Sequence, residues 1–259
     1  MRQKRKFPIR LLIMGGFILF SVISYYMKSQ VNPVTGEKQR VSLSPEEEVA
    51  MGLQSAPQMA AQFGGLYADN NVQLKIRSIG QRLVNSSHAS KSPYQFNFHV
   101  LADERTINAF ALPGGQIFIT AAMLSKLKTE DAVASVLGHE IAHVIHRHSA
   151  EQMAQKGLLN GIIQGVAMGS GTMNGGQIAS YVGQMVNMKY GRDDELESDE
   201  FGVKYCHQAG YDPRAALDVM KVLAEASGGA DRSDFNSTHP SPANRIEKIN
   251  EHLAALPAR

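Results

Sequence analysis

One predicted helix, Asp131–Gln155, constrains this chain more than any other segment. It begins with an apolar run and then carries the motif H-E-I-A-H, which starts at His139. Residues four apart lie one above the other on a helix, so His139 and His143 can point ring nitrogens at one metal ion. Glu140 lies beside them, where its carboxylate can reach a water on that ion. Because two histidines and a glutamate in an apolar helix need polar partners, the fold must bury this helix against further ligands.

A catalytic zinc site needs a third protein ligand and one open position. In the extended pattern H-E-x-x-H-x-x-G-x-x-H, the glycine and third histidine would fall on His146 and Ser149, so that pattern fails. The stretch Gln152–Arg192 contains no Asp, Glu or His, and the next oxygen donors form an acidic cluster directly after it. There Glu195 could bind the metal while Asp199, on the same helix face, accepts the spare N–H of a ligating histidine. The competing interpretation of this cluster is a solvated acidic helix start.

The periodicity of apolar residues predicts an α+β domain, with helices first, then a small β-sheet, then further helices. Hydrophobic residues make up 43% and charged residues 19% of the chain, which excludes a disordered or fibrous protein. The expected strands are 94–101, 106–111 and 116–120. The expected helices are 45–62, 71–84, 121–127, 131–155, 193–208, 213–226 and 243–253.

The chain opens with a basic segment followed by a charge-free run, Leu11–Met27. A helix of this length reaches roughly 25 Å and can just span a bilayer core. We therefore expect residues 1–28 to form a membrane anchor, with a cleaved signal peptide as the alternative. Basic residues stay in the cytoplasm, so the rest of the chain would lie outside it. Residues 29–42 are expected to be a linker and residues 43–256 one folded domain. The five early cations are Arg2, Lys4, Arg5, Lys6 and Arg10.

Charge and cysteine content exclude two further classes of protein. The net charge is +2 and most early cations precede the apolar run, so the remainder is near neutral and nothing indicates nucleic-acid binding. Cys206 is the single cysteine, which excludes an intrachain disulfide and a cysteine-based zinc cluster. A metal site must therefore use histidines and carboxylates, and two imidazoles with one carboxylate make zinc the default ion.

Three motifs in this order resemble family forty-eight of the metallopeptidases, the HtpX and CAAX prenyl protease type, which belongs to the gluzincin zinc endopeptidases. They are H-E-I-A-H from His139, E-L-E-S-D from Glu195 and S-T-H-P from Ser237. The resemblance covers most of the chain from Ser44 to Leu253 and is closest to anchored or periplasmic single-domain members. Two departures, Gly191 and Ser198, lie at positions that touch no ligand.

The resemblance implies a mainly helical, zincin-like metallopeptidase domain and a role for each site residue. Glu195 would be the third zinc ligand, and Asp199 would hydrogen-bond to a histidine that binds the zinc. His239 would assist at the oxyanion, and Arg245 would lie nearby. The edge strand that pairs with substrate would be Asn108-Ala109-Phe110-Ala111.

The expected activity is a zinc-dependent endopeptidase with one zinc per chain and Glu140 as general base and later proton donor. Its substrates would be misfolded envelope or membrane proteins, and its catalytic domain would lie on the periplasmic side of the inner membrane. A soluble periplasmic enzyme is the alternative location. The alternative function is an envelope assembly or chaperone-like binding protein with a non-catalytic zinc site, and a histidine-rich metal buffer is a third option.

Two other features leave alternatives open. His146 could play a part behind the ligands or in the groove, or be an ordinary surface residue, whereas His148 is expected to point away and be structural. The segment Gly157–Met188 carries no charge and has glycines every four residues in its first part. We expect a helical hairpin packed on the domain, or else a lid or a surface that touches membrane or a partner.

Overall fold

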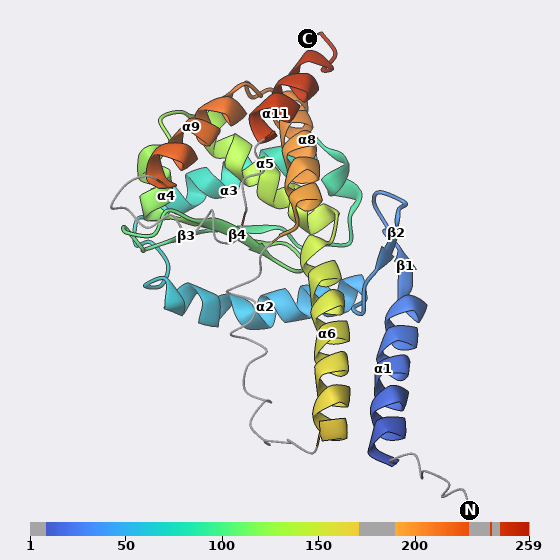
Figure 1. The fold of residues 1–259 in the computed structure, drawn as a ribbon. Helices are drawn as coiled ribbons and strands as arrows, with labels where there is room; N and C mark the ends of the chain where they lie inside the picture. Colours follow the sequence, from blue (N-terminus) through green and yellow to red (C-terminus); the bar gives the residue numbers. More distant parts are fainter. Residues whose placement is uncertain (1–8, 171–189, 228–238, 240–243, 259) are drawn as a thin grey trace, which may run out of the picture.

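The computed structural model describes residues 9–170, 190–227, 239 and 244–258, and Figure 1 shows their arrangement. A small sheet lies between two layers of helices, and two long helices project together from one side. The chain is mainly helical with small sheets, which confirms the predicted α+β class.

The sheet contains β3 (Asn97–Leu101), β5 (Gln116–Thr120) and β4 (Ala109–Leu112), in that spatial order. β3 pairs with β5 in parallel, and β4 pairs with β5 in antiparallel orientation. The turn between β4 and β5 contains Gly114, whose φ of +77° suits glycine. A Cβ there would lie 2.4 Å from Cα of Val49. The glycine therefore lets the helix that carries Val49 approach the sheet closely.

Helices cover both faces of the sheet (Figure 1). α2 (Pro45–Gln62) contacts β4 and β5 from one side, while α3 (Asn70–Asn85) and α5 (Glu130–Ile145) contact the strands from the other. Ser44 caps α2 and forms a capping box with Glu47. The remaining elements of the domain are η1 (His88–Lys91), α4 (Ala121–Lys126), α8 (Arg192–Gln208), α9 (Ala215–Ser227) and α11 (Arg245–Ala254).

The predicted single helix 131–155 is wrong, because the structure divides it into α5 and α6 (His148–Ser170). The break lies at Arg147, whose φ is +58°, a left-handed conformation that costs a non-glycine residue roughly 1–2 kcal/mol. The Arg147 side chain is buried, and its Nε and Nη2 donate to Oε1 of Glu48 at 2.8 and 2.5 Å. Nη2 also donates to the carbonyl of Leu43 at 2.7 Å. These bonds hold the break in place against α2.

The segment 29–42, expected to be a linker, contains an antiparallel hairpin of β1 (Ser29–Val31) and β2 (Lys38–Arg40). Asn32 donates to the carbonyl of Ile145 at 2.8 Å, and Gln39 donates to that of His146 at 2.5 Å. The last carbonyls of a helix lack partners within it, so this hairpin caps α5. The sequence pattern missed the hairpin because its stabilising partners lie more than 100 residues away.

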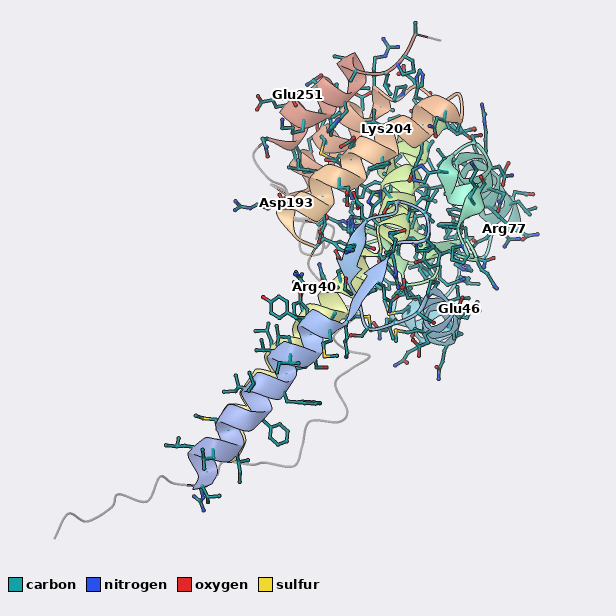
Figure 2. The ribbon with its side chains drawn as sticks, turned by 90° about the vertical axis from the view of Figure 1, so that its right-hand side faces the viewer. Arg40, Glu46, Arg77, Asp193, Lys204 and Glu251 are labelled. Carbon is teal, nitrogen blue, oxygen red and sulfur yellow. The ribbon has the colours of Figure 1, made fainter. Side chains whose placement is uncertain are left out.

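The two projecting helices are α1 (Ile9–Met27) and α6, which lie side by side (Figure 2). Within the described residues, α1 is the one helix long and apolar enough to cross a membrane, and none of its residues is buried. The predicted hairpin 157–188 falls partly on α6. Its second half and the turn 169–176 extend into residues outside the described part of the chain.

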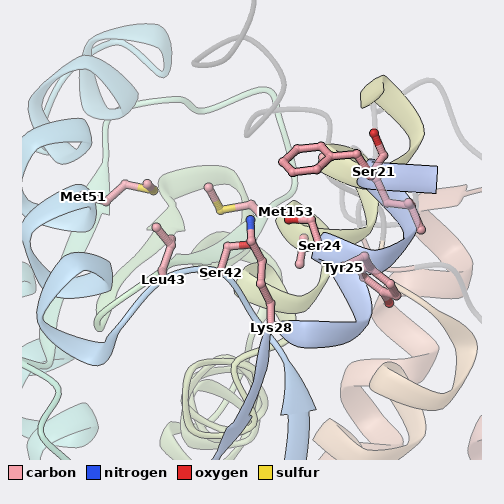
Figure 3. A pocket seen from close by; sticks show the side chains of 12 residues that line it. Ser21, Ser24, Tyr25, Lys28, Ser42, Leu43, Met51 and Met153 are labelled. Carbon is pink, nitrogen blue, oxygen red and sulfur yellow. The ribbon is translucent and has the colours of Figure 1, made fainter. Parts of the chain in front are cut away.

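A pocket of about 310 Å³ lies where α1 and α6 meet the domain (Figure 3). Lys28 and Ser24 contribute polar groups to it, and Met51 and Met153 contribute apolar ones. The pocket is thus lined by residues of α1, α2, α6 and the segment before α2.

Replacing Arg147 with Met should destabilise the full chain by roughly 3–5 kcal/mol, because Glu48 would remain buried without its cationic partner. Adding Glu48→Leu should recover much of this loss, since the buried charge is then removed. Urea unfolding of both variants in detergent measures the effect. A single-variant cost under about 1 kcal/mol, or a double variant less stable than the single one, would contradict this role.

Candidate metal centre

The centre is built where α5 crosses α8. Gly138 and Gly202 lie at the crossing, and a Cβ on Gly202 would stand only 3.1 Å from the backbone nitrogen of His139. This close approach brings the first turns of α8, which carry Glu195 and Asp199, alongside the histidines of α5. Small residues at the crossing thus set the distance between the ligands.

The structure brings together the three residues expected to bind zinc. Nε2 of His139 lies 3.0 Å from Nε2 of His143, and each of these nitrogens lies 3.5 Å from a different carboxylate oxygen of Glu195. All three side chains are buried. Tetrahedral zinc with bonds of about 2.0–2.1 Å places its donors roughly 3.3–3.4 Å apart. The spacing of the donors therefore fits such an ion.

Asp199 fixes the orientation of the His139 ring. Its Oδ1 lies 3.0 Å from Nδ1 of His139, and its two oxygens accept from Arg245 at 2.7 Å each. Burial alone would raise the pKa of Asp199, but the bond from His139 and the charge of Arg245 lower it. A carboxylate at this position holds the proton on Nδ1 and leaves the Nε2 lone pair facing the centre.

His143 is oriented by a second chain of bonds, which corrects the prediction that His148 points away. Nδ1 of His143 lies 2.8 Å from Nδ1 of His148, whose Nε2 lies 2.8 Å from Oε2 of Glu197. The carboxylate holds a proton on Nε2 of His148, so Nδ1 of His148 accepts the Nδ1 proton of His143. Because α6 starts a new helix after the break, His148 leaves the face that one continuous helix would give it.

With their ring protons on Nδ1, His139 and His143 present their Nε2 atoms to each other at 3.0 Å. Two facing lone pairs repel unless a proton or a metal ion lies between them. Burial opposes charge on His139, yet the bonds to Asp199 and Glu195 raise its pKa to about 9. Burial alone would raise the pKa of Glu195, but His239 and the ring nitrogens of the other two histidines hold it well below its usual range. The centre is therefore built to attract a positive ion.

Glu140 is fully buried beside the donors, and neither of its carboxylate oxygens hydrogen-bonds to any residue in the described part of the chain. Nε2 of His239 lies 3.6 Å from its Oε1. Burial raises the pKa of Glu140. A buried carboxyl group with a raised pKa is suited to accept a proton and return it.

His239 lies closer to the donors than an assisting group needs to be. Its Nδ1 is 2.9 Å from Oε1 of Glu195, and it belongs to the group of four buried donors that lie within 4.8 Å of one another. Arg245 approaches from the other side, with Nη1 3.0 Å from Oε2 of Glu195. In this arrangement His239 could act as a fourth donor, whereas a catalytic metal needs one open position.

Sequence reasoning missed Tyr190, whose ring stacks on that of His143 at 3.8 Å between centroids. Its hydroxyl lies 2.9 Å from Oγ of Ser149, at the start of α6. The one available signal was an aromatic residue just before the acidic helix that supplies Glu195. Tyr190 closes one wall of the centre.

The predicted substrate strand, 108–111, overlaps β4 at one edge of the sheet. Among the described strands β4 pairs only with β5, through residues 109–112. Oδ1 of Asn108 is buried and makes no hydrogen bond to a described residue. Ala109, Phe110 and Ala111 are buried too, and α5 packs against this strand.

Comparison with known proteins identifies the family and relatives of this chain. The model of peptidase family M48 matches residues 70–253. Mitochondrial metalloendopeptidase OMA1 of Schizosaccharomyces pombe is 30% identical over 93% of this chain and 71% of its own length. The beta-barrel assembly-enhancing protease of Yersinia pestis is 30% identical over 83% of this chain and 45% of its own length. A putative protease of the same name from Vibrio cholerae is 32% identical over 70% and 39%. The chain thus spans less than half of either bacterial relative.

Replacing His148 with Ala should weaken zinc binding about 10–100-fold, because His143 loses the acceptor that orients it. His148→Gln, which retains an acceptor oxygen, should recover part of the affinity. His99→Ala, at a histidine bonded to Gln116 on the sheet, is the matched control. Competition with a fluorescent zinc chelator measures the affinity. Equal affinity in wild type and His148→Ala would show that this chain of bonds does not matter.

Proposed function

The chain belongs to peptidase family M48, and on that premise we propose that it cleaves envelope or membrane proteins with one zinc ion held by His139, His143 and Glu195. It is a metalloendopeptidase, so its substrates are proteins. The observation that carries the proposed roles is Glu140, a buried carboxylate without a hydrogen bond in the described structure, next to converging donors. A purely structural metal site has no use for such a group.

When bound, the zinc ion supplies Lewis-acid chemistry, because it acidifies water and polarises a carbonyl. Side chains of the protein carry out the proton transfers and orient the ligands. Glu140 takes the proton of the attacking water and later gives it to the leaving amine nitrogen. Asp199 and His148 keep the two ligating rings in the tautomer that binds metal. Arg245 holds Glu195 and Asp199 in place through its paired bonds.

His239 completes the reaction site in this proposal. Catalysis requires an open position, whereas His239 lies among the donors here. We propose that its ring moves aside when a substrate carbonyl enters and then donates a hydrogen bond to the carbonyl oxygen as negative charge develops. Its position 3.6 Å from Glu140 keeps it within reach of the reacting atoms.

The substrate is proposed to bind as an extended strand along Asn108–Ala111. An extended peptide can add to a sheet edge through main-chain bonds, which recognise no particular side chain. The edge position of β4 and its packing against α5 support this direction of entry. Broad specificity of this kind suits a protease that removes misfolded proteins.

We propose that the enzyme is anchored in the inner membrane by α1, with residues 43–256 forming the catalytic domain on the periplasmic side. The exposed apolar surface of α1 and the basic residues that precede it support this orientation. The uncharged part of α6 lies beside α1, so it would accompany the anchor toward the membrane. The Schizosaccharomyces pombe and Yersinia pestis relatives named above are a mitochondrial metalloendopeptidase and a beta-barrel assembly-enhancing protease, which supports a role at membranes.

Replacing Glu140 with Gln should abolish hydrolysis of casein while zinc remains bound at the wild-type stoichiometry, because the base is lost and the ligands are kept. Glu104→Gln, at an exposed glutamate, is the matched control and should cleave normally. Casein cleavage and zinc content are measured on the same preparations. Near-normal cleavage by Glu140→Gln would refute the assigned base.

A further inference from the structure

A second group of potential metal ligands lies next to the first. Nδ1 of His146, Nε2 of His148 and a carboxylate oxygen of Glu197 belong to side chains whose donor atoms lie within 4.8 Å of one another. Oε2 of Glu197 is 3.0 Å from the His146 nitrogen and 2.8 Å from the His148 nitrogen. The break between α5 and α6 supplies the histidines, and α8 supplies the glutamate.

His146 is the feature that ordinary packing leaves unexplained. Its side chain is 1% exposed, yet neither ring nitrogen makes a hydrogen bond within the described part of the chain. Nδ1 nevertheless lies 3.0 Å from Oε2 of Glu197, an ion-pair contact, whereas Nε2 has no partner among the described residues. Phe201 packs on the ring at 4.3 Å between centroids and holds it facing the glutamate. Buried polar groups without partners are rare, and such a group beside two other donors indicates a ligand.

We propose that His146, His148 and Glu197 form a second binding site, for a divalent transition-metal ion such as zinc. Two imidazoles and one carboxylate are the donors that these ions prefer. The side chain of Glu197 is 34% exposed while both histidines are buried, so an ion reaches the site from solvent on the Glu197 side. This site is separate from the catalytic donors, which are His139, His143 and Glu195.

The hydrogen bond between His143 and His148 connects the two sites, so an ion in the second site opposes binding of the catalytic ion. An ion on Nε2 of His148 leaves the proton of that neutral ring on Nδ1, which lies 2.8 Å from Nδ1 of His143. His143 also carries its proton on Nδ1 when its Nε2 faces the catalytic ion. Two N–H groups would then face each other, and the acceptor that orients His143 would be lost. Binding of the second ion therefore lowers the affinity for the catalytic ion about tenfold or more. It thereby inhibits the enzyme, an inference that rests on the proposed function.

The first test counts ions. The full chain in detergent is dialysed against excess zinc chloride, and bound zinc is measured by elemental analysis. Wild type should bind two ions per chain, and His146→Ala and His146→Gln should each bind one. His99→Ala, the matched control, should bind two. A single ion in wild type at saturation, or two ions in folded His146 variants, would overturn the proposal. Circular dichroism confirms that each variant is folded.

The second test measures antagonism. Peptide hydrolysis is measured while the zinc concentration is raised beyond one equivalent per chain. The rate of each protein is expressed relative to its own rate at one equivalent. Wild type should lose activity as the second ion binds, and His146→Gln should need at least tenfold more zinc for the same loss. Equal inhibition of both would refute antagonism. Two ions without hydrolysis would refute the proposed function alone, whereas hydrolysis with one ion at saturation would refute the second site alone.

Discussion

The structure depends on the burial of charged side chains where α5 crosses α8. Glu195 and Asp199 are buried, and a buried carboxylate is tolerated only when it is paired and hydrogen-bonded. Arg245 binds both of them, and the ring of His139 contacts both as well. A proton or a metal ion can satisfy the remaining negative charge and the facing ring nitrogens of the histidines. The packing of the two helices and the affinity for metal are therefore consequences of one network.

The break after α5 connects this network to the end of the molecule from which α1 and α6 project. Arg147 joins the break to α2, and Asn32 and Gln39 of the hairpin cap the carbonyls of Ile145 and His146. The hairpin follows α1 directly, and α6 runs from the break alongside α1. The same break turns His148 toward His143. The backbone that links α1 to the domain thus also sets the orientation of His143, a proposed zinc ligand.

The candidate donors of the centre could be predicted from the sequence because the spacing of the motifs leaves few choices. H-E-I-A-H places two rings on one helix face, and the absence of Asp, Glu and His from Gln152 to Arg192 directs the search to the acidic cluster that contains Glu195. The structure brings these side chains together with Asp199 and Arg245. The break at Arg147 was not predictable, because neither glycine nor proline marks it and its partner Glu48 lies 99 residues away. The roles of His148 and Tyr190 depend on that break and could not be inferred from periodicity.

The central claim is that two histidines of α5 and one glutamate of α8 hold a single catalytic ion. Zinc content of the full chain, purified and then dialysed against metal-free buffer, tests it most directly when compared with that of a folded Glu195→Ala variant. The account predicts about one tightly held zinc per chain in wild type and almost none in the variant, because removal of a protein ligand opens the cage. Equal zinc content in the two proteins, or none in wild type, would contradict it.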